Sequence, residues 1–437
     1  MSFERTVPTG WDITNLEEVV DILDSKRVPI NAKERETRVG QVPYYGATGQ
    51  VGWIDDYLFD EELVLLGEDG APFLDAAKQK AYVVRGKSWV NNHAHVLRAR
   101  SDIPNAYIKY YLDTVDYHEF ITGTTRLKLN QAAMRRIPVP LAPPNERAHI
   151  VAEIEKQFSR LDEAVANLKR VKANLKRYKA SVLKAAVEGK LTEDWRKQHP
   201  DVEPASKLLE RILAERRAKF GRKKDSFLTA EGDPPAEAPD GWAICSIDQI
   251  AECLDAKRVP VNKAERAKRG GNVPYYGANG QVGVIDDYIF DEPLVLVVED
   301  ETFTGRTQAF SYLIRGKSWV NNHAHVLRAT DAVTASYLNY GLAHYPFIPR
   351  TTGSTGRRKL TQRGLMTAPF LLPPLIEQEQ IVAEVERRLS VIDELEAAVQ
   401  ANLTRADRLR QSILTQAFSG KLLLRDLQLH EAAPIGS

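Results

Sequence analysis

The chain repeats itself, and this duplication constrains its fold more than any other feature. The stretch VPYYGATGQVG at residues 42–52 returns as VPYYGANGQVG at 273–283, and GKSWVNNHAHVLRA at 86–99 returns unchanged at 316–329. The copies are separated by 231 residues, or by 230 around the second block. Similarity at a nearly constant offset indicates that one structural unit is present twice. We therefore expect two similar domains in tandem.

Each repeat opens with short apolar runs between glycine or asparagine turns, a pattern that favours strands. Leu63–Leu66, Tyr82–Arg85 and Ala94–Arg98 are such runs, and a helix is expected at Asn105–Tyr117. These observations predict a small mixed α/β domain with a twisted sheet.

Each repeat then continues, after a pair of prolines, with apolar residues at gaps of three and four, the spacing of coiled-coil helices. The residues expected to pack between the helices are Ile150, Ile154, Leu161, Leu168, Leu175, Ile381, Val385, Ile392, Val399 and Leu409. Segment 146–190 carries a net charge of +5 and segment 377–421 one of −2, which favours pairing of the two copies. The residues alone leave the relative direction of the helices open.

We expect an α+β chain with six parts. They are a first domain at 1–142, a long helix at 143–191, a linker with a short amphipathic helix at 192–240, a second domain at 241–372, a second long helix at 373–422 and a tail at 423–437. The first ten residues lack the apolar core of a signal peptide, and no apolar run is long enough to span a membrane. Cys245 and Cys253 match no zinc or redox motif, so a reducing cytoplasm is expected.

The block SWVNNHAHVLR contains amides, imidazoles and a guanidinium, which are groups that contact base edges and phosphates. Its candidate DNA-binding residues are Lys87, Asn91, Asn92 and His93, with Lys317, Asn321, Asn322 and His323 in the second copy. A buried polar network that holds the domain together is an equally good interpretation. His93 and His95 have no evident third ligand nearby, so no metal site is predicted.

The paired tyrosines and turn glycines of the first block suit contact with sugars and bases. The candidates here are Tyr44, Tyr45, Thr48 and Gln50, with Tyr275, Tyr276, Asn279 and Gln281 in the second copy. A β-hairpin with a structural tyrosine pair explains the same pattern.

Cations gather at two further places in each repeat. Lys26 and Arg27, repeated as Lys257 and Arg258, follow an aspartate in a nuclease-like Asp-x-Lys pattern, but no suitably placed upstream carboxylate accompanies them, and a basic DNA-facing turn is the preferred interpretation. Arg126, Lys128, Arg357, Arg358 and Lys359 lie among glycines and hydroxyl residues, which suits phosphate contacts, although a solvated loop has the same composition.

The repeats diverge at 67–85 against 298–315 and at 100–126 against 330–357. We interpret the shared blocks as a platform that touches the DNA backbone, and the diverged loops as the parts that discriminate bases. The net charge of +1 means that any basic patch is local. The sequence contains no GxxxxGK[ST] phosphate-binding motif and no glycine-rich S-adenosylmethionine signature, so no catalytic site is predicted.

Each repeat contains the same series of motifs in the same order, either unchanged or nearly so. The series is Gly-Trp, YYGATGQVG, SWVNNHAHVLRA, a proline pair, a long helix and GKL. As an ordered set, these motifs resemble the specificity subunit of type I restriction–modification systems. Glu377–Ile381 resembles the opening of that family's helix, and Gly189–Arg196 and Leu208–Arg217 resemble its central region.

The resemblance implies two target-recognition domains related by a pseudo-twofold through antiparallel helices, each domain reading half of a bipartite DNA site, with the helices setting the spacer. It also implies a non-catalytic chain that binds no cofactor itself. Its partners would be double-stranded DNA, two modification subunits that use S-adenosylmethionine, and restriction subunits that use ATP and Mg²⁺. The alternative is a two-domain protein-interaction scaffold without DNA specificity.

Overall fold

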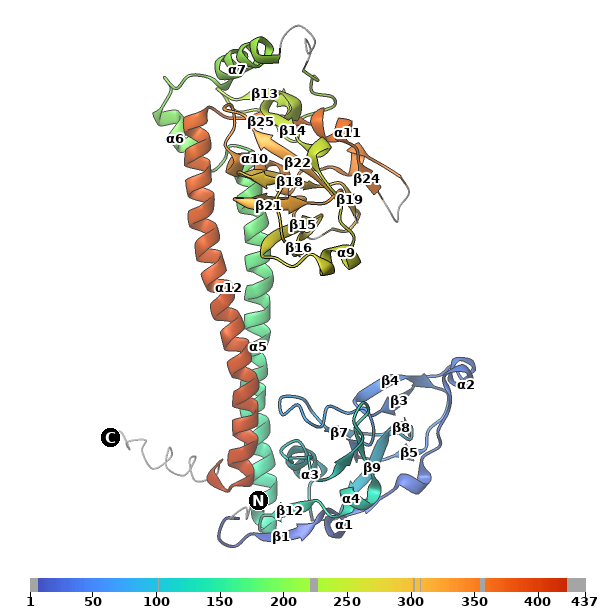
Figure 1. Ribbon diagram of the computed structural model, residues 1–437. Helices are drawn as coiled ribbons and strands as arrows, with labels where there is room; N and C mark the ends of the chain where they lie inside the picture. The colour runs from blue at the N-terminus through green and yellow to red at the C-terminus, as the bar shows by residue number, and fades with distance from the viewer. Residues whose placement is uncertain are drawn as a thin grey trace, which may run out of the picture. The chain divides into compact units, whose positions relative to one another are not determined.

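The computed structural model describes residues 7–100, 102–220, 227–301, 303–306, 308–353 and 358–422 (Figure 1). The chain forms two compact units. The first consists of Met1–Val171 and Ala398–Ser437, and the second of Lys172–Ala397. Each unit therefore contains one repeat's domain and parts of both long helices. No helix among the described residues is both long and apolar enough to cross a membrane.

The first unit contains two four-stranded sheets, in the orders β2-β9-β6-β7 and β4-β3-β8-β5, together with the small pairs β1-β12 and β10-β11. Its strands are β1 (Asp12–Asn15), β2 (Val20–Ile22), β3 (Val42–Gly46), β4 (Gly49–Ile54), β5 (Phe59–Asp60), β6 (Leu63–Gly67), β7 (Ala81–Val84), β8 (Lys87–Val90), β9 (Ala94–Ala99), β10 (Ile121–Thr122), β11 (Lys128–Leu129) and β12 (Pro138–Leu141). Its short helices are α1 (Leu16–Val19), α2 (Ala32–Thr37), α3 (Asn105–Leu112) and α4 (Gln131–Arg135).

The second unit repeats this topology, with sheets β14-β22-β18-β20 and β16-β15-β21-β17, the pair β13-β25 and the three-stranded β19-β24-β23. Its strands are β13 (Ala243–Ser246), β14 (Ala251–Cys253), β15 (Val273–Gly277), β16 (Gly280–Ile285), β17 (Phe290–Asp291), β18 (Leu294–Val298), β19 (Asp300–Glu301), β20 (Ser311–Ile314), β21 (Lys317–Val320), β22 (Ala324–Ala329), β23 (Thr351–Thr352), β24 (Arg358–Leu360) and β25 (Pro369–Leu372). Its helices are α6 (Glu193–Gln198), α7 (Ala205–Phe220), α8 (Ile247–Ile250), α9 (Lys263–Lys268), α10 (Ala335–Ala343) and α11 (Gln362–Met366).

Each domain therefore has two four-stranded sheets, besides the smaller ones, where the sequence predicts one sheet. The first conserved block forms the β3–β4 hairpin, and β3 pairs in parallel with β8 rather than joining the sheet of β6. The apolar run of β6 is buried on both faces: Val64 and Leu66 belong to one hydrophobic cluster, and Leu63 and Leu65 belong to another. Burial on both faces explains why this strand lacks the apolar–polar alternation of a half-exposed strand.

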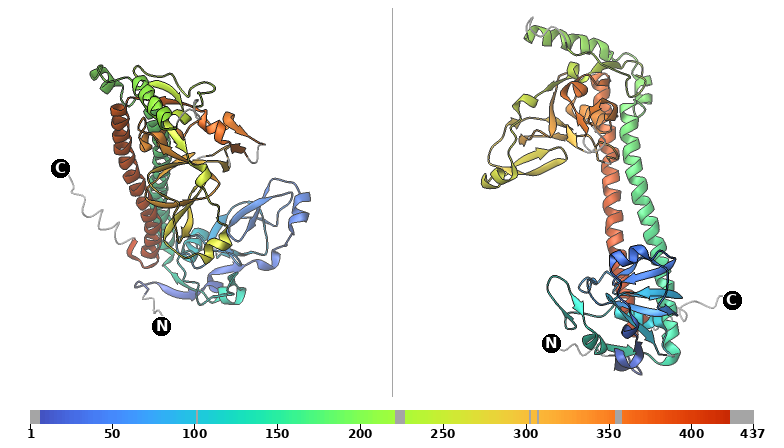
Figure 2. Two further views of the ribbon diagram at one scale, coloured as in Figure 1. Left: turned by 45° about the horizontal axis from the view of Figure 1, so that its top comes forward. Right: turned by 90° about the vertical axis from the view of Figure 1, so that its right-hand side faces the viewer.

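The long helices α5 (Pro144–Val187) and α12 (Leu375–Phe418) run antiparallel, and two ion pairs give their register. In the first unit Asp162 pairs with Arg410, and in the second Lys179 pairs with Asp393 over 2.9 Å. A step of 17 residues up α5 thus corresponds to a step of 17 down α12. Figure 2 shows the two helices lying side by side.

The buried face of α12 follows a heptad. Its residues Val385, Ile392, Val399, Ala406 and Ile413 are all buried at intervals of seven. The expected packing residue Leu409 is 47% exposed, which corrects the sequence interpretation. Leu409 is three positions after one member of this row and four before the next, so it lies outside the row and flanks the contact.

On α5, the expected packing residues Ile150, Ile154 and Leu161 are buried, whereas Leu168 and Leu175 are half-buried. Glycine ends both long helices: Gly189 and Gly420 have φ values of +70° and +71°. A side chain on either would also clash with a proline in the same unit.

Candidate nucleic-acid interface

A buried aspartate–histidine pair underlies the candidate site of the first repeat. Asp24, in the 3₁₀ turn before β3, accepts hydrogen bonds from Nδ1 of His95 over 2.7 Å and from the backbone N–H of Val96 over 2.8 Å. Nε2 of His95 lies 2.9 Å from the carbonyl oxygen of Leu129. Both ring nitrogens of His95 therefore face oxygen atoms. The pair joins the turn to β9 and β11.

The second repeat contains the same pair. Nδ1 of His325 lies 2.5 Å from Asp255, and its Nε2 lies 2.8 Å from the carbonyl oxygen of Leu360. Burial by itself would raise the pKa of the Asp24 and Asp255 carboxyls. The hydrogen bond and the charge of the partner histidine outweigh it, so the pKa of each carboxyl is lowered. Both carboxylates are therefore held ionised inside the fold.

Arg27 and Arg258, predicted to face DNA, point into this network instead. The guanidinium of Arg27 donates to Glu68 over 2.7 Å and to the carbonyl of Ala94 over 2.8 Å, and Arg258 bonds to Glu299 in the same way over 2.5 Å. Their side chains are only 14% and 13% exposed. We therefore remove both arginines from the proposed DNA-contacting set, because contact with a phosphate would break the hydrogen bonds to a glutamate and to a backbone carbonyl that hold each guanidinium within the fold.

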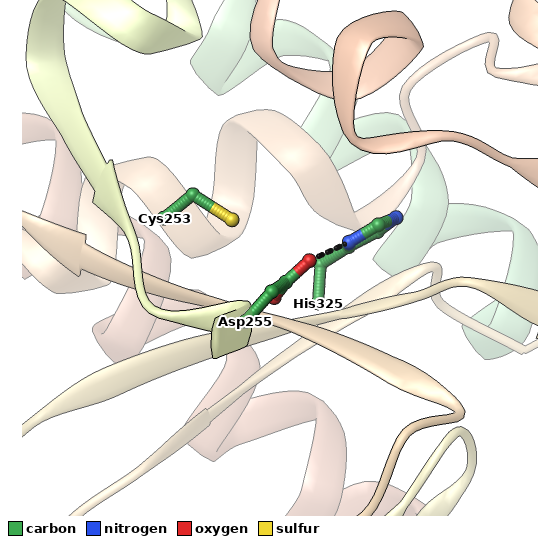
Figure 3. Close-up of side chains that lie close together, drawn as sticks. All are labelled: Cys253, Asp255 and His325. Carbon is green, nitrogen blue, oxygen red and sulfur yellow. Dashed lines mark hydrogen bonds and ion pairs between the residues drawn. The ribbon is translucent and has the colours of Figure 1, made fainter. Parts of the chain in front are cut away.

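The donor atoms of Cys253, Asp255 and His325 lie within 4.8 Å of one another, which raises the question of a metal site (Figure 3). Ligands on one Zn²⁺ ion lie about 3.3 Å apart, because each bond is about 2 Å long and the geometry is tetrahedral. The 2.5 Å between Asp255 and His325 is a hydrogen-bond distance, and Arg258 lies 3.3 Å from the same carboxylate. Burial raises the pKa of the Cys253 thiol to about 12, and the first repeat has Ile22 at this position. The group therefore fits an internal hydrogen-bonded pair better than a metal site.

Three segments of the first repeat meet beside the aspartate–histidine pair: the β3–β4 hairpin tip, the turn between β8 and β9, and the loop after β6. The hydroxyl of Tyr82 donates to the carbonyl of Gly46 at the hairpin tip. A Cβ atom on Gly46 would lie 3.3 Å from the side-chain amide of Asn91 in the turn. Nδ1 of His93, in the same turn, lies 2.6 Å from Asp69 in the loop.

Two predicted cations reach the same place. Arg126 lies 3.0 Å from Asp69 and Lys128 lies 3.2 Å from Glu68, and both cationic side chains are more than half exposed. We call this surface the first rim; it consists of Thr48, Asn91, Asn92, His93, Arg126 and Lys128. Apart from Asn91, which is buried, and His93, which is partly buried, its residues are exposed.

The second rim is built alike and consists of Asn279, Asn321, Asn322, His323 and Lys359. His323 lies 2.7 Å from Asp300, and Lys359 lies 3.0 Å from Glu299. Arg357, which the sequence also assigns to this surface, lies outside the described residues.

The predicted tyrosine pairs divide into two roles. Tyr44 and Tyr275 are 1% exposed, and the hydroxyl of Tyr275 bonds to the backbone of Val261, so these two rings belong to the core rather than to a DNA-facing surface. Tyr45 and Tyr276 are half-buried, and each packs on a second tyrosine at about 6 Å.

The remaining predicted residues lie away from the rims or are used within the fold. Lys87 and Lys317 extend over the rings of Tyr57 and Tyr288 at 4.6 Å, at the end of β8 or β21 opposite the rim turn. Lys26 and Lys257 are exposed on the 3₁₀ turns. Gln50 and Gln281 bond to carbonyls of their own strands, and Arg358 bonds to Ile348 and Thr351.

The structure adds Arg306 to the second rim. Its guanidinium donates to Oδ1 of Asn279 over 2.8 Å. Sequence reasoning missed this arginine because it lies in a diverged loop and belongs to no motif shared by the repeats.

The family model for the type I restriction modification DNA specificity domain matches residues 8–177 and 239–405, once in each repeat. The chain belongs to this family. Each matched segment of this specificity-domain protein includes one aspartate–histidine pair and one rim.

Some relatives are similar over most of the chain. The specificity subunit of the type I restriction enzyme EcoDI from Escherichia coli is 24% identical over 95% of this chain and 89% of its own length. That of EcoKI from E. coli K12 is 25% identical over 75% and 68%. A Haemophilus influenzae relative is 33% identical, but this chain spans only 34% of its length.

The fold also has a solved counterpart. A chain in a structure described as the "structural basis underlying complex assembly and conformational transition of the type I R-M system" aligns with a TM-score of 0.62. The alignment covers 95% of this specificity-domain protein and 99% of that chain, at 16% identity. At this identity, the similarity shows a shared fold.

Proposed function

We propose that the chain is the DNA-binding specificity subunit of a type I restriction–modification complex. Each repeat recognises one half of a bipartite DNA site, and the paired helices set the spacer between the halves. The observation that carries the proposal is the presence of two similarly built rims in a chain that the specificity-domain family matches twice.

The chemistry of the rims supports DNA as the ligand. Each rim offers amides that can both donate and accept, an imidazole and at least one cation, and these groups suit base edges and phosphates. The carboxylates of Glu68 and Asp69 hold the cations in place in the free protein. On binding, Arg126 and Lys128 would exchange these partners for phosphates, which makes binding sensitive to salt.

The proposed contacts are the sequence candidates that remain once the four inward-facing residues are set aside. They are Lys26, Tyr45, Thr48, Gln50, Lys87, Asn91, Asn92, His93, Arg126 and Lys128 in the first repeat, and Lys257, Tyr276, Asn279, Gln281, Lys317, Asn321, Asn322, His323, Arg357, Arg358 and Lys359 in the second. Tyr44, Tyr275, Arg27 and Arg258 support these residues from within the fold.

We further propose that the chain is not itself a catalyst. Methyl transfer with S-adenosylmethionine would belong to two modification subunits, and DNA cleavage with ATP and Mg²⁺ to restriction subunits. The relatives are named as specificity subunits of restriction enzymes, which supports this division.

The test is binding to a pool of random DNA duplexes, followed by sequencing of the bound fraction at two salt concentrations. A specificity subunit selects two short motifs at a constant spacing, and its affinity falls steeply with salt. Binding without any selected sequence, or no DNA binding at all, would instead favour a two-domain scaffold for another protein.

A further inference from the structure

We propose that a hollow on the second unit binds an arginine side chain of a partner protein. The hollow has a volume of about 580 Å³ and lies between α10 and α12. Its lining includes Tyr340 of α10 and Glu386, Leu389, Ser390, Asp393 and Glu394 of α12. None of these residues belongs to a rim, so the inference goes beyond the proposed DNA recognition and does not depend on it.

The same residues recur in the first repeat, with one exception. At an offset of 231 residues, or of 230 for the tyrosine, the counterparts are Tyr110, Glu155, Phe158, Ser159, Asp162 and Glu163. The exception is Leu389, whose counterpart Phe158 is larger and aromatic. The contacts of the first set therefore indicate what the second set can bind.

In the first unit, this set of residues holds a guanidinium. Arg410 of α12 pairs with Asp162, and its guanidinium carbon lies 4.3 Å from the centre of the Phe158 ring. Tyr110 packs edge-on against the same ring, with 5.6 Å between the ring centres. Phe158 is buried and the side chain of Arg410 is only 25% exposed. The arginine and the phenyl ring together occupy the place that corresponds to the hollow.

The second unit has a smaller cation at this position. The counterpart of Arg410 is Lys179 of α5, whose Nζ lies 2.9 Å from Asp393. A lysine beside a leucine takes less space than an arginine stacked on a phenylalanine, which accounts for the hollow. Within the described part of the chain, neither Glu386 nor Glu394 pairs with a cation. The acidic side chains are thus kept from one repeat to the other, while the guanidinium is not.

The charges around the hollow favour a cation. Three carboxylates line it, and only one of them is paired with Lys179. Burial and the nearby carboxylate of Glu386 raise the pKa of the Tyr340 hydroxyl, and the charge of Arg315 opposes this shift. A guanidinium in the hollow can lie on the Tyr340 ring and pair with Glu386 or Glu394.

A protein side chain suits the hollow better than a free small cation. The acidic residues are exposed, Asp393 by 62%, so each ion pair adds little affinity by itself. A free cation would lose its own translational freedom on binding, whereas an arginine on a protein surface shares that loss with the other contacts of the interface. The group held in the first unit is likewise a protein side chain.

The experiment uses the full chain with isotope-labelled tyrosine rings and follows the NMR signals of Tyr340 and Tyr110. Tyr340→Phe and Tyr110→Phe identify these signals. The probe is Nα-acetylarginine amide, and its lysine analogue is the comparison. The Tyr340 signal should shift to saturation with a dissociation constant in the millimolar range, while the Tyr110 signal stays unchanged. The lysine probe should bind about threefold more weakly or worse, because an ammonium cannot lie flat on the ring.

One pair of double variants tests the carboxylates. Glu386→Gln with Glu394→Gln should weaken binding of the arginine probe by about threefold or more, because both unpaired charges are lost. The matched control is Glu155→Gln with Glu163→Gln, which removes the counterpart charges from the first unit and should leave the Tyr340 response unchanged.

A second pair exchanges the contents of the two places. Leu389→Phe with Lys179→Arg introduces the residues of the first unit, fills the hollow and should abolish the response of Tyr340. Phe158→Leu with Arg410→Lys makes the reverse change, and Tyr110 should then respond to the arginine probe. Circular dichroism establishes that each variant is folded.

Three outcomes would overturn the proposal: the wild-type Tyr340 signal shows no saturable shift, the two probes bind equally, or the filled variant binds the arginine probe as wild type does. Self-association of the wild-type chain in sedimentation velocity, lost in the filled variant, would assign the hollow to a second copy of this chain and overturn the partner protein. Because none of these measurements uses DNA, their outcome is independent of the proposed DNA recognition.

Discussion

The indole nitrogen of Trp242 donates a hydrogen bond to Oε2 of Glu377 over 2.9 Å, and this contact ties the start of the second domain to the first turn of α12. Thr192 donates to the other carboxylate oxygen of Glu377 over 2.7 Å, and Arg196 pairs with it. The first repeat has the matching bond from Trp11 to Glu146, at 3.2 Å. The tryptophan of each Gly-Trp motif thus connects its domain to the first turn of the long helix that follows that domain.

Replacing Glu377 by Gln should destabilise the second unit by about 3 kcal/mol, because it leaves the partly buried charge of Arg196 without its partner. Glu146→Gln is the matched control. Glu146 is half-exposed, so this change should cost about 1 kcal/mol or less. Urea unfolding followed by tryptophan fluorescence measures both. Equal losses for the two variants would contradict a special role for the Glu377 cluster.

The aspartate–histidine pairs should make the free energy of unfolding depend on pH in the acidic range. The pKa of Asp24 and of Asp255 is lowered from 3.8 in the folded protein, so the unfolded chain binds protons more readily. Their contribution is complete above the unfolded pKa of about 3.9 and is lost as the pH falls through the folded value. The double variant Asp24→Asn, Asp255→Asn should therefore be less stable than wild type at pH 6, and the difference should shrink below about pH 4.

Urea midpoints between pH 3 and pH 6 test this expectation. The exposed Asp12→Asn variant controls for the loss of a carboxylate alone and should follow the wild-type curve. A gap between wild type and double variant that does not change with pH would show that the carboxylate charge does not contribute.

Lys128→Ala and Lys359→Ala should each weaken binding to all DNA sequences about equally and reduce the slope of log affinity against log salt by about one. Lys197→Ala is the matched control, since this exposed lysine also pairs with a glutamate but lies on α6, outside both rims. Titrations at stepped salt concentrations measure the slope. Weakened binding of the selected site alone, with other DNA unaffected, would identify the lysine as a base reader.

The antiparallel register allows a direct test of whether the length of the helix pair sets the spacing between the two DNA half-sites. Deleting 165–171 together with 401–407 removes facing heptads, because these segments follow the register of the Asp162–Arg410 pair. The deletion shortens the helix pair by about 10 Å. At about 3.4 Å per base pair, the preferred gap between half-sites should shrink by roughly three pairs. The change in helical phase should also cost some affinity.

Binding to duplexes whose gap changes one pair at a time measures the optimum. Deleting two residues from each helix should instead break the heptad row and impair folding. A folded seven-residue variant with an unchanged optimum would mean that the spacing is set elsewhere.

The sequence by itself determined the duplication, the strand runs and the existence of two long paired helices. These features follow from local periodicity: β6 and β9 lie within a residue of the predicted runs, and each long helix ends two residues before the expected glycine. The predicted helix after β9 is shorter than expected, since α3 ends at Leu112. The order of motifs was enough to predict the family.

Only the tertiary structure decided how these parts meet. The direction of the helices depends on contacts such as Lys179 with Asp393, which are 214 residues apart. The inward orientation of Arg27 depends on Glu68, which the turn sequence does not predict. The pairing of Arg306 with Asn279 likewise joins a loop to a hairpin tip. The surroundings of a side chain are formed by segments that are distant in the sequence. The packing of those segments therefore decides whether a residue lies in the core, supports a neighbouring side chain or is exposed at the surface.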